Sequence, residues 1–427
     1  MTKAEPITAS DPAGPDPAGP AAFRRRVFYI PGYDPIHPRR YRELYRKEGT
    51  DQARISGYSL TLQPRKTKGP YGWRVTSATA AKTAPAATTE SEVEVLVWSD
   101  IVRHSMNQGI LATYLQLIRT AAIYIGSGAL FRLMGLRKGP MIAALYPIAM
   151  LLVQLALALT AGYGLYRLGT LLHPALGLVA ALVMITLILR RFRAKDNRLY
   201  AYYLMHDYAF TAQNHGANPP ELEARMARFR AIIAAALTEN LDEVLIVGHS
   251  SGAHLAVSIL ADLIRADPNL SGLPANHPAL GFLSLGQVVP MVSFLPGARR
   301  LRADLRYLSA RTELTWVDVT APGDGCAFAL CDPVSVTGVA PPDKRWPLVI
   351  SAAFTQTLSP ERWAHLRWRF FRLHFQYLCA FDALNGGPGD YDYFQITAGP
   401  LTLRQRYANR APSKSRVETP RSGYRST

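Results

Sequence analysis

The stretch VLIVGHSSGAHLA, residues 244–256, joins an apolar run to a helix-like pattern through a turn of small residues. The run VLIV is typical of a buried strand, because it leaves no polar face. The residues AHLAVSILADLI that follow have the apolar spacing of a buried helix. Between the two lies GHSSG, residues 248–252, with Ser250 at its centre. Either this turn presents the hydroxyl of Ser250 for chemistry, or it is a tight turn that only requires small residues.

Strand-like and helix-like segments alternate on both sides of this turn. Such alternation predicts a mostly parallel α/β sheet flanked by helices, in which ligands bind at the carboxyl ends of the strands. Two β-rich stretches, ARISGYSLTLQP and YGWRVTSAT, are compatible with a hairpin. The other strand candidates are Val27–Ile30, Val93–Trp98, LGFLSLG, LTWVDV and WPLVIS, and the helix candidates include His37–Glu48 and PPELEARMARFRAIIAAALTEN.

Two long uncharged runs interrupt the alternation. One lies between Lys138 and Arg167 and the other extends from Leu168 to Leu189, and each is long enough to span a bilayer. Their close spacing around Arg167 predicts a transmembrane helical hairpin. Two buried core helices are the alternative, which is disfavoured because adjacent runs of this length are rare in soluble folds.

The charges around the two runs predict their orientation. Only Arg167 lies between them, and basic residues gather on the outer flanks. The positive-inside rule therefore places both flanks and both termini in the cytoplasm. The preceding segment, residues 109–135, is interrupted by Arg119 and Arg132, so we expect an interfacial helix or a cap over a site. The flanking basic residues are Arg132, Arg137, Lys138, Arg190, Arg191, Arg193 and Lys195.

The composition limits the classes of partner. A formal net charge of +17 indicates an anionic partner or surface. No helix-turn-helix signature or Cys/His finger is present, so we expect a membrane with anionic headgroups rather than nucleic acid. The chain has 3 cysteines without metal-ligand spacing, which fits a reducing compartment and predicts neither a metal nor a cofactor. The sequence leaves the oligomeric state open.

The pattern G-x-S-x-G between a strand and a helix is typical of a nucleophile elbow. The strained turn exposes the hydroxyl of Ser250, and the N–H of Ser251 points toward a developing oxyanion. Here the chain resembles the α/β-hydrolase superfamily, in particular its lipase- and esterase-like members. The resemblance covers roughly residues 27–100 and 219–384. It implies a mostly parallel α/β-hydrolase-type sheet flanked by helices and interrupted by the two-helix transmembrane insertion.

The resemblance also implies where the other functional groups lie. In that superfamily a second oxyanion donor comes from the loop after an early strand, which matches YIPGYDP in this chain. The resemblance therefore implies that the N–H of Tyr33 is this second oxyanion donor, with the N–H of Gly32 as the second candidate. The HGGG pattern of many lipases is absent from this loop, and a plain strand-ending Pro-Gly turn is the alternative.

A serine hydroxyl needs a base, and the base needs an orienting acid. The superfamily's chain order is serine, acid, histidine. Asp324 follows a strand in a Gly-flanked loop, although Gly-Asp-Gly is also ordinary turn chemistry, and Asp318 inside that strand is the second candidate. His374 is the expected base and His365 the second candidate, whereas His277 precedes every acid candidate. The segment around His374 has a helical pattern, unlike the loop that usually carries the superfamily's histidine.

These observations predict a membrane-anchored serine hydrolase that cleaves an ester or thioester of an apolar acyl group, with a lipid or acyl ester as substrate. A non-catalytic membrane scaffold that keeps the hydrolase fold is one alternative. A peptidase or an acyltransferase with the same triad is another. The expected organisation is a disordered tail at 1–22, a first part of the domain at 23–108, the interfacial segment and hairpin at 109–195 (spans at about 140–165 and 169–189), a second part at 196–400 and a basic disordered tail at 401–427.

Overall fold

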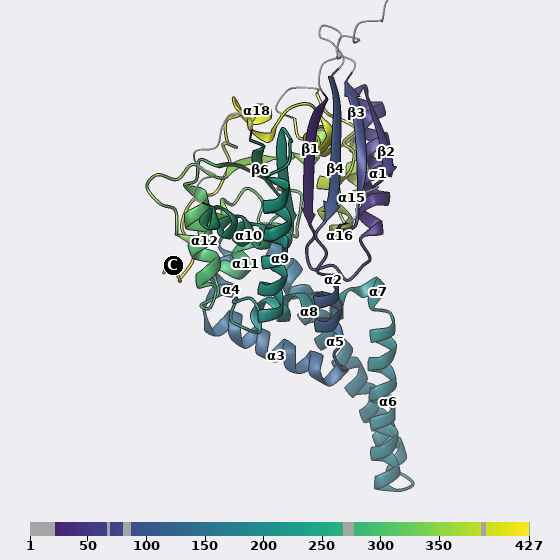
Figure 1. Ribbon diagram of the computed structural model, residues 1–427. Helices are drawn as coiled ribbons and strands as arrows, with labels where there is room; N and C mark the ends of the chain where they lie inside the picture. Colours follow the sequence, from purple (N-terminus) through teal and green to yellow (C-terminus); the bar gives the residue numbers. More distant parts are fainter. Residues whose placement is uncertain (1–21, 66–68, 80–86, 268–276, 386–389, 427) are drawn as a thin grey trace, which may run out of the picture.

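Eight strands form one mixed sheet in the order β2-β3-β4-β1-β5-β6-β7-β8. The computed structural model describes residues 22–65, 69–79, 87–267, 277–385 and 390–426 (Figure 1). Five of the strand pairings are parallel, and β2–β3 and β3–β4 are antiparallel. The predicted mostly parallel α/β sheet is therefore confirmed, and so is the predicted β-hairpin, which β2 and β3 form. The strands are β1 (Phe23–Ile30), β2 (Tyr58–Pro64), β3 (Gly72–Thr79), β4 (Ala87–Val95), β5 (Glu243–His249), β6 (Ala279–Leu285), β7 (Leu314–Thr320) and β8 (Leu348–Ser351).

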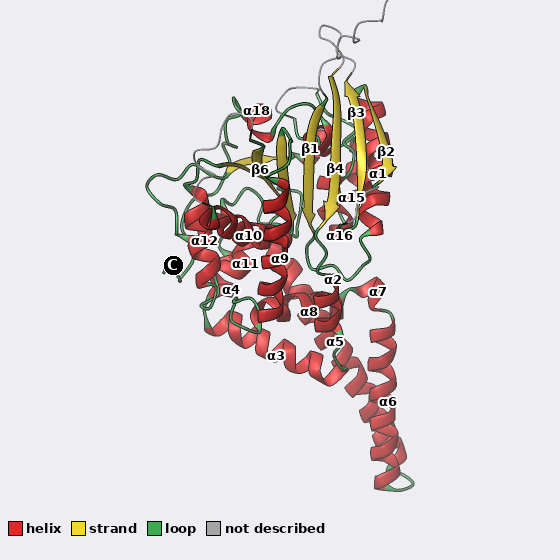
Figure 2. Cartoon of the chain, viewed as in Figure 1, coloured by secondary structure: helices red, strands yellow, loops and turns green. Residues whose placement is uncertain are grey.

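Helices cover both faces of the sheet, as Figure 2 shows. Strand β5 lies at its centre, with Val244 and Ile246 in one apolar core and Leu245 and Val247 in the other. A strand that is covered on both faces needs apolar residues at every position, which explains the continuous run VLIV. The covering helices include α9 (Pro220–Ala236), α10 (Gly252–Ala266) and α12 (Arg299–Ser309) on one face, and α1 (Arg39–Ser56), α15 (Pro360–Leu366), α16 (Phe370–His374) and α17 (Tyr393–Ala398) on the other.

Two helices project from the domain as a hairpin, α5 (Lys138–Gly169) and α6 (Pro174–Ala194) (Figure 1). Both are long and apolar enough to cross a membrane, and only 28% and 17% of their most apolar windows are buried. The predicted pair of membrane-length helices is thus confirmed. The turn between them lies after Gly169, whereas Arg167 stays within the last turn of α5. A single charge does not end a helix, but Pro174 begins a new one after His173, whose side chain accepts a hydrogen bond from the N–H of Ala175.

The segment between β4 and the hairpin forms α2 (Ser99–Met106), α3 (Ile110–Gly126) and α4 (Ala129–Met134). Helix α3 presents an apolar outer face, because Leu111, Leu115 and Ile118 are exposed, whereas Thr113 and Leu117 are buried. It runs across the base of the domain at a steep angle to the hairpin (Figure 1). After the hairpin, α7 (Asp196–Leu199) and α8 (Ala201–Ala212) return the chain to the sheet, and α8 packs against α3 and α5.

The C-terminal segment differs from the prediction. Residues 401–426 are ordered: α18 (Leu403–Tyr407) packs near β6 and β7, Val417 pairs with Cys331, and the carbonyl of Ser426 accepts from Arg302. The prediction of a disordered tail was based on Pro, Ser and Arg content, which does not reveal such anchoring contacts. The predicted N-terminal tail lies outside the described residues, apart from Ala22.

A buried ion pair holds the start of this C-terminal segment to the central strands. Arg25 on β1 and Glu243 on β5 are fully buried, and Arg25 Nε lies 2.5 Å from Glu243 Oε2. Arg25 also donates to the carbonyls of Gly399 and Leu401, at 2.8 and 2.6 Å. Glu243 accepts from the N–H of Leu403 at 2.6 Å. This one ion pair thus links β1, β5 and the start of the C-terminal segment.

We expect Arg25→Leu to lower the free energy of unfolding by about 3–5 kcal/mol, because it leaves Glu243 as an uncompensated buried charge. The double variant Arg25→Leu/Glu243→Leu should be less destabilised than the sum of the two single variants. Thermal unfolding of the purified chain in detergent micelles measures both effects. Additive losses would show that the two charges are not coupled.

Candidate active site

The turn between β5 and α10 holds Ser250 in a strained conformation. Its φ is 56°, in the left-handed region that residues other than glycine rarely adopt. The N–H of Ser250 donates to the carbonyl of Leu285 at 2.9 Å, and its own carbonyl accepts from Ala253 at 3.1 Å. At Gly252 a Cβ would lie 2.1 Å from the carbonyl oxygen of Ile30. The sequence GHSSG therefore permits a sharp turn against β1 that a larger residue at position 252 would prevent.

The loop after β1 passes directly beside the serine. A Cβ on Gly32 would lie 3.0 Å from the Cβ of Ser250. The loop is held from outside, because Trp98 Nε1 donates to the carbonyl of Pro31 at 2.9 Å and the hydroxyl of Tyr203 donates to the carbonyl of Tyr33. Among the described residues, the N–H groups of Tyr33 and Ser251 make no hydrogen bond. Both amides are free to bind an oxyanion.

The predicted residues around Ser250 line one cavity of about 800 Å³. Gly32, Tyr33, Ser251 and His374 all lie on its wall with Ser250. The described structure has no hydrogen bond between the hydroxyl of Ser250 and His374, and such contacts often tighten only when substrate is bound. The volume falls within the range of about 300–1,000 Å³ that is common for ligand pockets.

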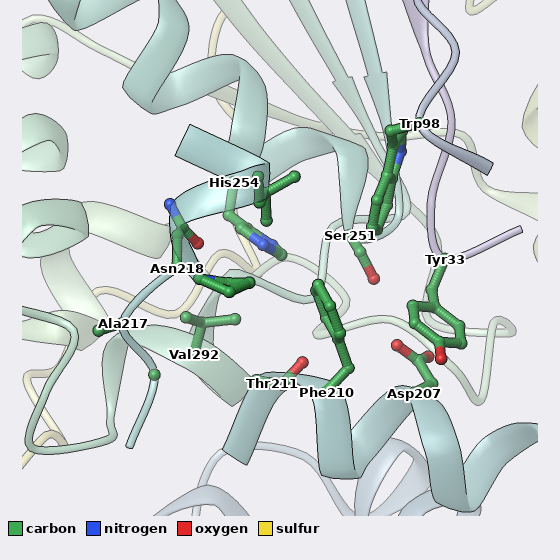
Figure 3. Close-up of a pocket in the computed structure, with 13 residues that line it drawn as sticks. Tyr33, Trp98, Asp207, Phe210, Thr211, Ala217, Asn218, Ser251, His254 and Val292 are labelled. Carbon is green, nitrogen blue, oxygen red and sulfur yellow. The ribbon is translucent and has the colours of Figure 1, made fainter. Parts of the chain in front are cut away.

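Asp207 on α8 lines the same cavity and was not identified from the sequence. It also borders an adjoining chamber of about 20 Å³, together with Ser251 and His254 (Figure 3), which is room for one water molecule. Burial raises the pKa of Asp207 to about 7, and the charge of His374 opposes this shift. The signal in the sequence is a lone carboxylate in the aromatic helix AYYLMHDYAF, but only tertiary packing shows that it lines the same cavity as Ser250.

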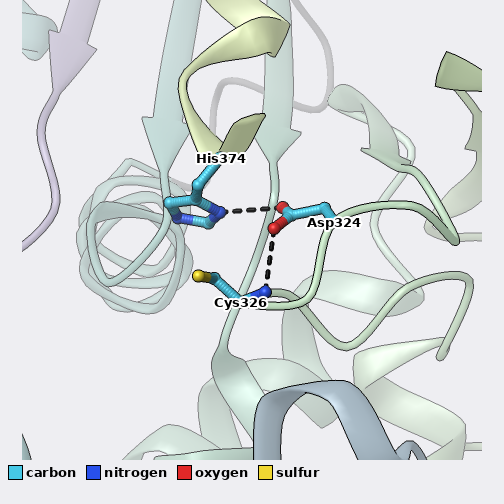
Figure 4. A group of neighbouring side chains, drawn as sticks. All are labelled: Asp324, Cys326 and His374. Carbon is cyan, nitrogen blue, oxygen red and sulfur yellow. Dashed lines mark hydrogen bonds and ion pairs between the residues drawn. The ribbon is translucent and has the colours of Figure 1, made fainter. Parts of the chain in front are cut away.

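Asp324 and His374 form a buried pair (Figure 4), with 2.8 Å between Asp324 Oδ2 and His374 Nδ1. Asp324 also accepts from the hydroxyl of Tyr377 at 3.0 Å and from the N–H of Cys326 at 2.9 Å. Burial opposes ionisation of Asp324, but the charge of His374 and these hydrogen bonds outweigh it and lower the pKa. A carboxylate only accepts, so Nδ1 carries a proton. When the ring carries no second proton, its Nε2 can act as a base.

His249 supports this pair from behind. Its Nε2 lies 3.1 Å from the backbone carbonyl of His374, which can only accept, so Nε2 carries the proton. Its Nδ1 then accepts from the hydroxyl of Tyr29 at 3.3 Å. Burial, with the charge of His374, lowers the pKa of His249 to about 3. His249 is therefore neutral and fixes the backbone that carries His374.

Cys326 adds a third potential metal ligand to the pair. One ligand atom each from Asp324, Cys326 and His374 lies within 4.8 Å of the others. Cysteine binds metals as the thiolate, but burial, and then the charge of Asp324, raise the pKa of the Cys326 thiol well above its usual value. Both carboxylate oxygens of Asp324 already accept hydrogen bonds. The donor set favours an acid–base pair over a metal site.

The structure does not bring the two second candidates to this site. Asp318 is buried within β7, where it accepts from the hydroxyl of Ser284 at 2.6 Å. Burial raises the pKa of Asp318 to about 8, so it is protonated near neutral pH. His365 is exposed on α15 and is not part of the cavity wall. The segment around His374, which has a helical pattern, is broken into short helices, and His374 is the last residue of α16.

No family model, no curated protein and no solved structure matches this chain. The function proposed below is therefore based on the geometry of the site.

Replacing Asp207 with asparagine tests its protonation in the folded protein. The pKa rises from an ordinary 3.8 to about 7 on folding, so the unfolded chain releases this proton first. Between these two pH values the wild-type protein should lose stability as the pH rises. We expect the unfolding temperature of Asp207→Asn to exceed that of the wild type by a margin that grows from pH 4 to pH 7 and then stays constant. A margin that does not vary with pH in thermal unfolding scans would contradict this assignment.

Proposed function

We propose that the chain is a membrane-anchored serine hydrolase of the α/β-hydrolase type, similar to esterases and lipases. The observation that carries the proposal is the convergence of three features on one cavity. These are Ser250 on a strained strand-to-helix turn, the buried pair of Asp324 and His374, of which His374 lines the cavity, and the free amides of Ser251 and Tyr33. The order serine, aspartate, histidine along the chain matches that of the superfamily.

In the proposed reaction, the hydroxyl oxygen of Ser250 attacks the acyl carbonyl carbon and Nε2 of His374 takes the hydroxyl proton. The carbonyl oxygen becomes an oxyanion, which the N–H groups of Ser251 and Tyr33 stabilise. Asp324 stays ionised beside the imidazolium. The ester bond to the alcohol then breaks, and His374 gives its proton to the departing alcohol.

Water completes the cycle. It attacks the acyl-enzyme and gives a proton to His374, which returns it to the oxygen of Ser250 as the carboxylic acid leaves. One ester and one water thus become one alcohol and one acid. The same acyl-enzyme would serve an acyltransferase if an alcohol replaced the water, and a peptidase would release an amine instead.

The position of the cavity supports an acyl lipid as substrate. Helix α5 has 32 residues and is about 48 Å long at 1.5 Å per residue, whereas the hydrocarbon core of a bilayer is about 30 Å thick. The helix is thus longer than the core is thick. We place the excess at its first turns, where Met141 and Ala144 pack into the domain and where Pro140, Ile142, Ala143 and Tyr146 line the cavity. We propose that the site lies at the cytoplasmic membrane surface, with anionic headgroups against the basic flanks of the hairpin.

The assay for the nucleophile is labelling with a fluorophosphonate probe in mild detergent. We expect wild-type protein to be labelled and Ser250→Ala to be unlabelled. Ser258→Ala is the matched control, because Ser258 is buried two turns further along α10 and is not part of the cavity wall. We expect Asp324→Asn and His374→Asn to lower kcat toward a p-nitrophenyl ester by a factor on the order of 10³–10⁴.

Folded wild-type protein that neither reacts with the probe nor cleaves the ester would overturn the proposal. That result would favour the non-catalytic scaffold.

The proposed orientation is tested with single cysteines in a chain whose 3 native cysteines are replaced by alanine. Leu172 at the hairpin tip is 83% exposed, and Arg410 is an exposed residue of the C-terminal segment. A membrane-impermeant maleimide should label Leu172→Cys on intact cells and Arg410→Cys only after permeabilisation. The opposite pattern would place the hydrolase domain outside the cytoplasm.

A further inference from the structure

Three arginines line the cavity that contains Ser250. Arg198 lies in α7, Arg369 directly precedes α16, and Arg372 lies within it. All three are exposed, so they mark the rim of the cavity rather than its depth. Among the described residues, none of their side chains has a hydrogen-bond or ion-pair partner. These three unpaired guanidinium groups are therefore available to bind an anionic ligand.

Aromatic packing brings together the two segments of chain that carry these arginines. The rings of Tyr200 and Phe371 have centroids 4.7 Å apart, and Tyr203 packs on Phe371 at 6.1 Å. Arg198 precedes Tyr200 by two residues, and Arg372 follows Phe371 directly. The contact therefore joins α7, at the base of the hairpin, to α16, which carries His374 at its end.

The same rim also exposes large apolar side chains. Trp368 is 73% exposed, Phe370 48% and Tyr200 40%, and Ile142 of α5 is 67% exposed. Exposed aromatic rings at the end of a membrane-length helix are typical of the membrane interface. The rim thus offers an apolar surface for a lipid chain and cations for its headgroup.

We propose that Arg198, Arg369 and Arg372 bind the phosphate of an anionic acyl lipid whose ester bond Ser250 cleaves. This inference rests on the hydrolase function proposed above. Guanidinium groups pair with phosphate oxygens through two parallel hydrogen bonds. The acyl chain lies along the apolar cavity wall, to which Met291, Val292 and the first turns of α5 contribute. The arginines are positioned to select the substrate by its headgroup.

The test compares two substrates with the same chain, 1-oleoylglycerol 3-phosphate and 1-oleoylglycerol, in micelles of a neutral detergent. For the wild type we expect kcat/KM to favour the phosphate by about tenfold or more. In the variant Arg198→Gln/Arg369→Gln/Arg372→Gln, the KM for the phosphate should rise about tenfold, so the preference falls toward one. A wild type without preference would overturn the inference.

The control separates substrate binding from general attraction to an anionic surface. The variant Arg190→Gln/Arg191→Gln/Lys195→Gln removes three positive charges at the same membrane boundary, from residues that do not line the cavity. We expect it to keep the preference for the phosphate. An equal loss of preference in both variants would attribute the effect to the surface and overturn the inference. Unfolding temperatures of both variants verify that they fold.

A binding experiment distinguishes failure of the hydrolase proposal from failure of the headgroup site. The ether analogue 1-O-octadecylglycerol 3-phosphate cannot be cleaved, and its affinity is compared with that of 1-O-octadecylglycerol. If the fluorophosphonate probe does not react but the phosphate analogue binds at least tenfold more tightly than the neutral one, the hydrolase proposal fails and the headgroup site remains. If the probe reacts and the two analogues bind equally, the headgroup site fails alone.

Discussion

Parallel pairing of β1 with β5 is the constraint on which the rest of the structure depends. The register joins Arg25 to Glu243 at one end and Ile30 to Gly248 at the other. Because parallel strands end at the same edge of a sheet, the loop carrying Tyr33 must emerge beside Ser250. The chain between these strands contains the whole helical hairpin of α5 and α6. One pair of strands thus places the insertion and the loops of the candidate site together.

The strain at Ser250 is balanced by the contacts around it. A residue other than glycine in the left-handed region costs on the order of 1 kcal/mol or more. The hydrogen bond to Leu285 and the start of α10 fix the turn, and Gly252 lets it lie against Ile30. The buried pair of Asp324 and His374 is stabilised in the same way, by the hydroxyl of Tyr377 at Asp324 and by His249 at the backbone carbonyl of His374.

Features encoded locally could be predicted from the sequence. The run VLIV followed by GHSSG specifies a doubly buried strand and a tight turn, and the uncharged runs specify the hairpin. Chain order selected Asp324 and His374, which the structure places 2.8 Å apart, although no comparison tests their role. Asp207 could not be found, because its position depends on how α8 packs over the cavity.

That the C-terminal segment is ordered could not be predicted either, because this also depends on tertiary packing. It depends on distant contacts, such as the one between Arg302 and Ser426, that no local pattern reveals.

The start of α5 is part of the cavity wall and also touches the loop of the acid. A Cβ on Gly139 would lie 3.2 Å from the Cα of Gly325, the neighbour of Asp324. A helix whose far end is embedded in lipid changes its tilt when bilayer thickness changes. If α5 crosses the membrane as proposed, such a change of tilt would shift its first turn against the loop that carries Asp324. In the proposed membrane-anchored hydrolase, membrane thickness would thereby act on the chemistry at Ser250.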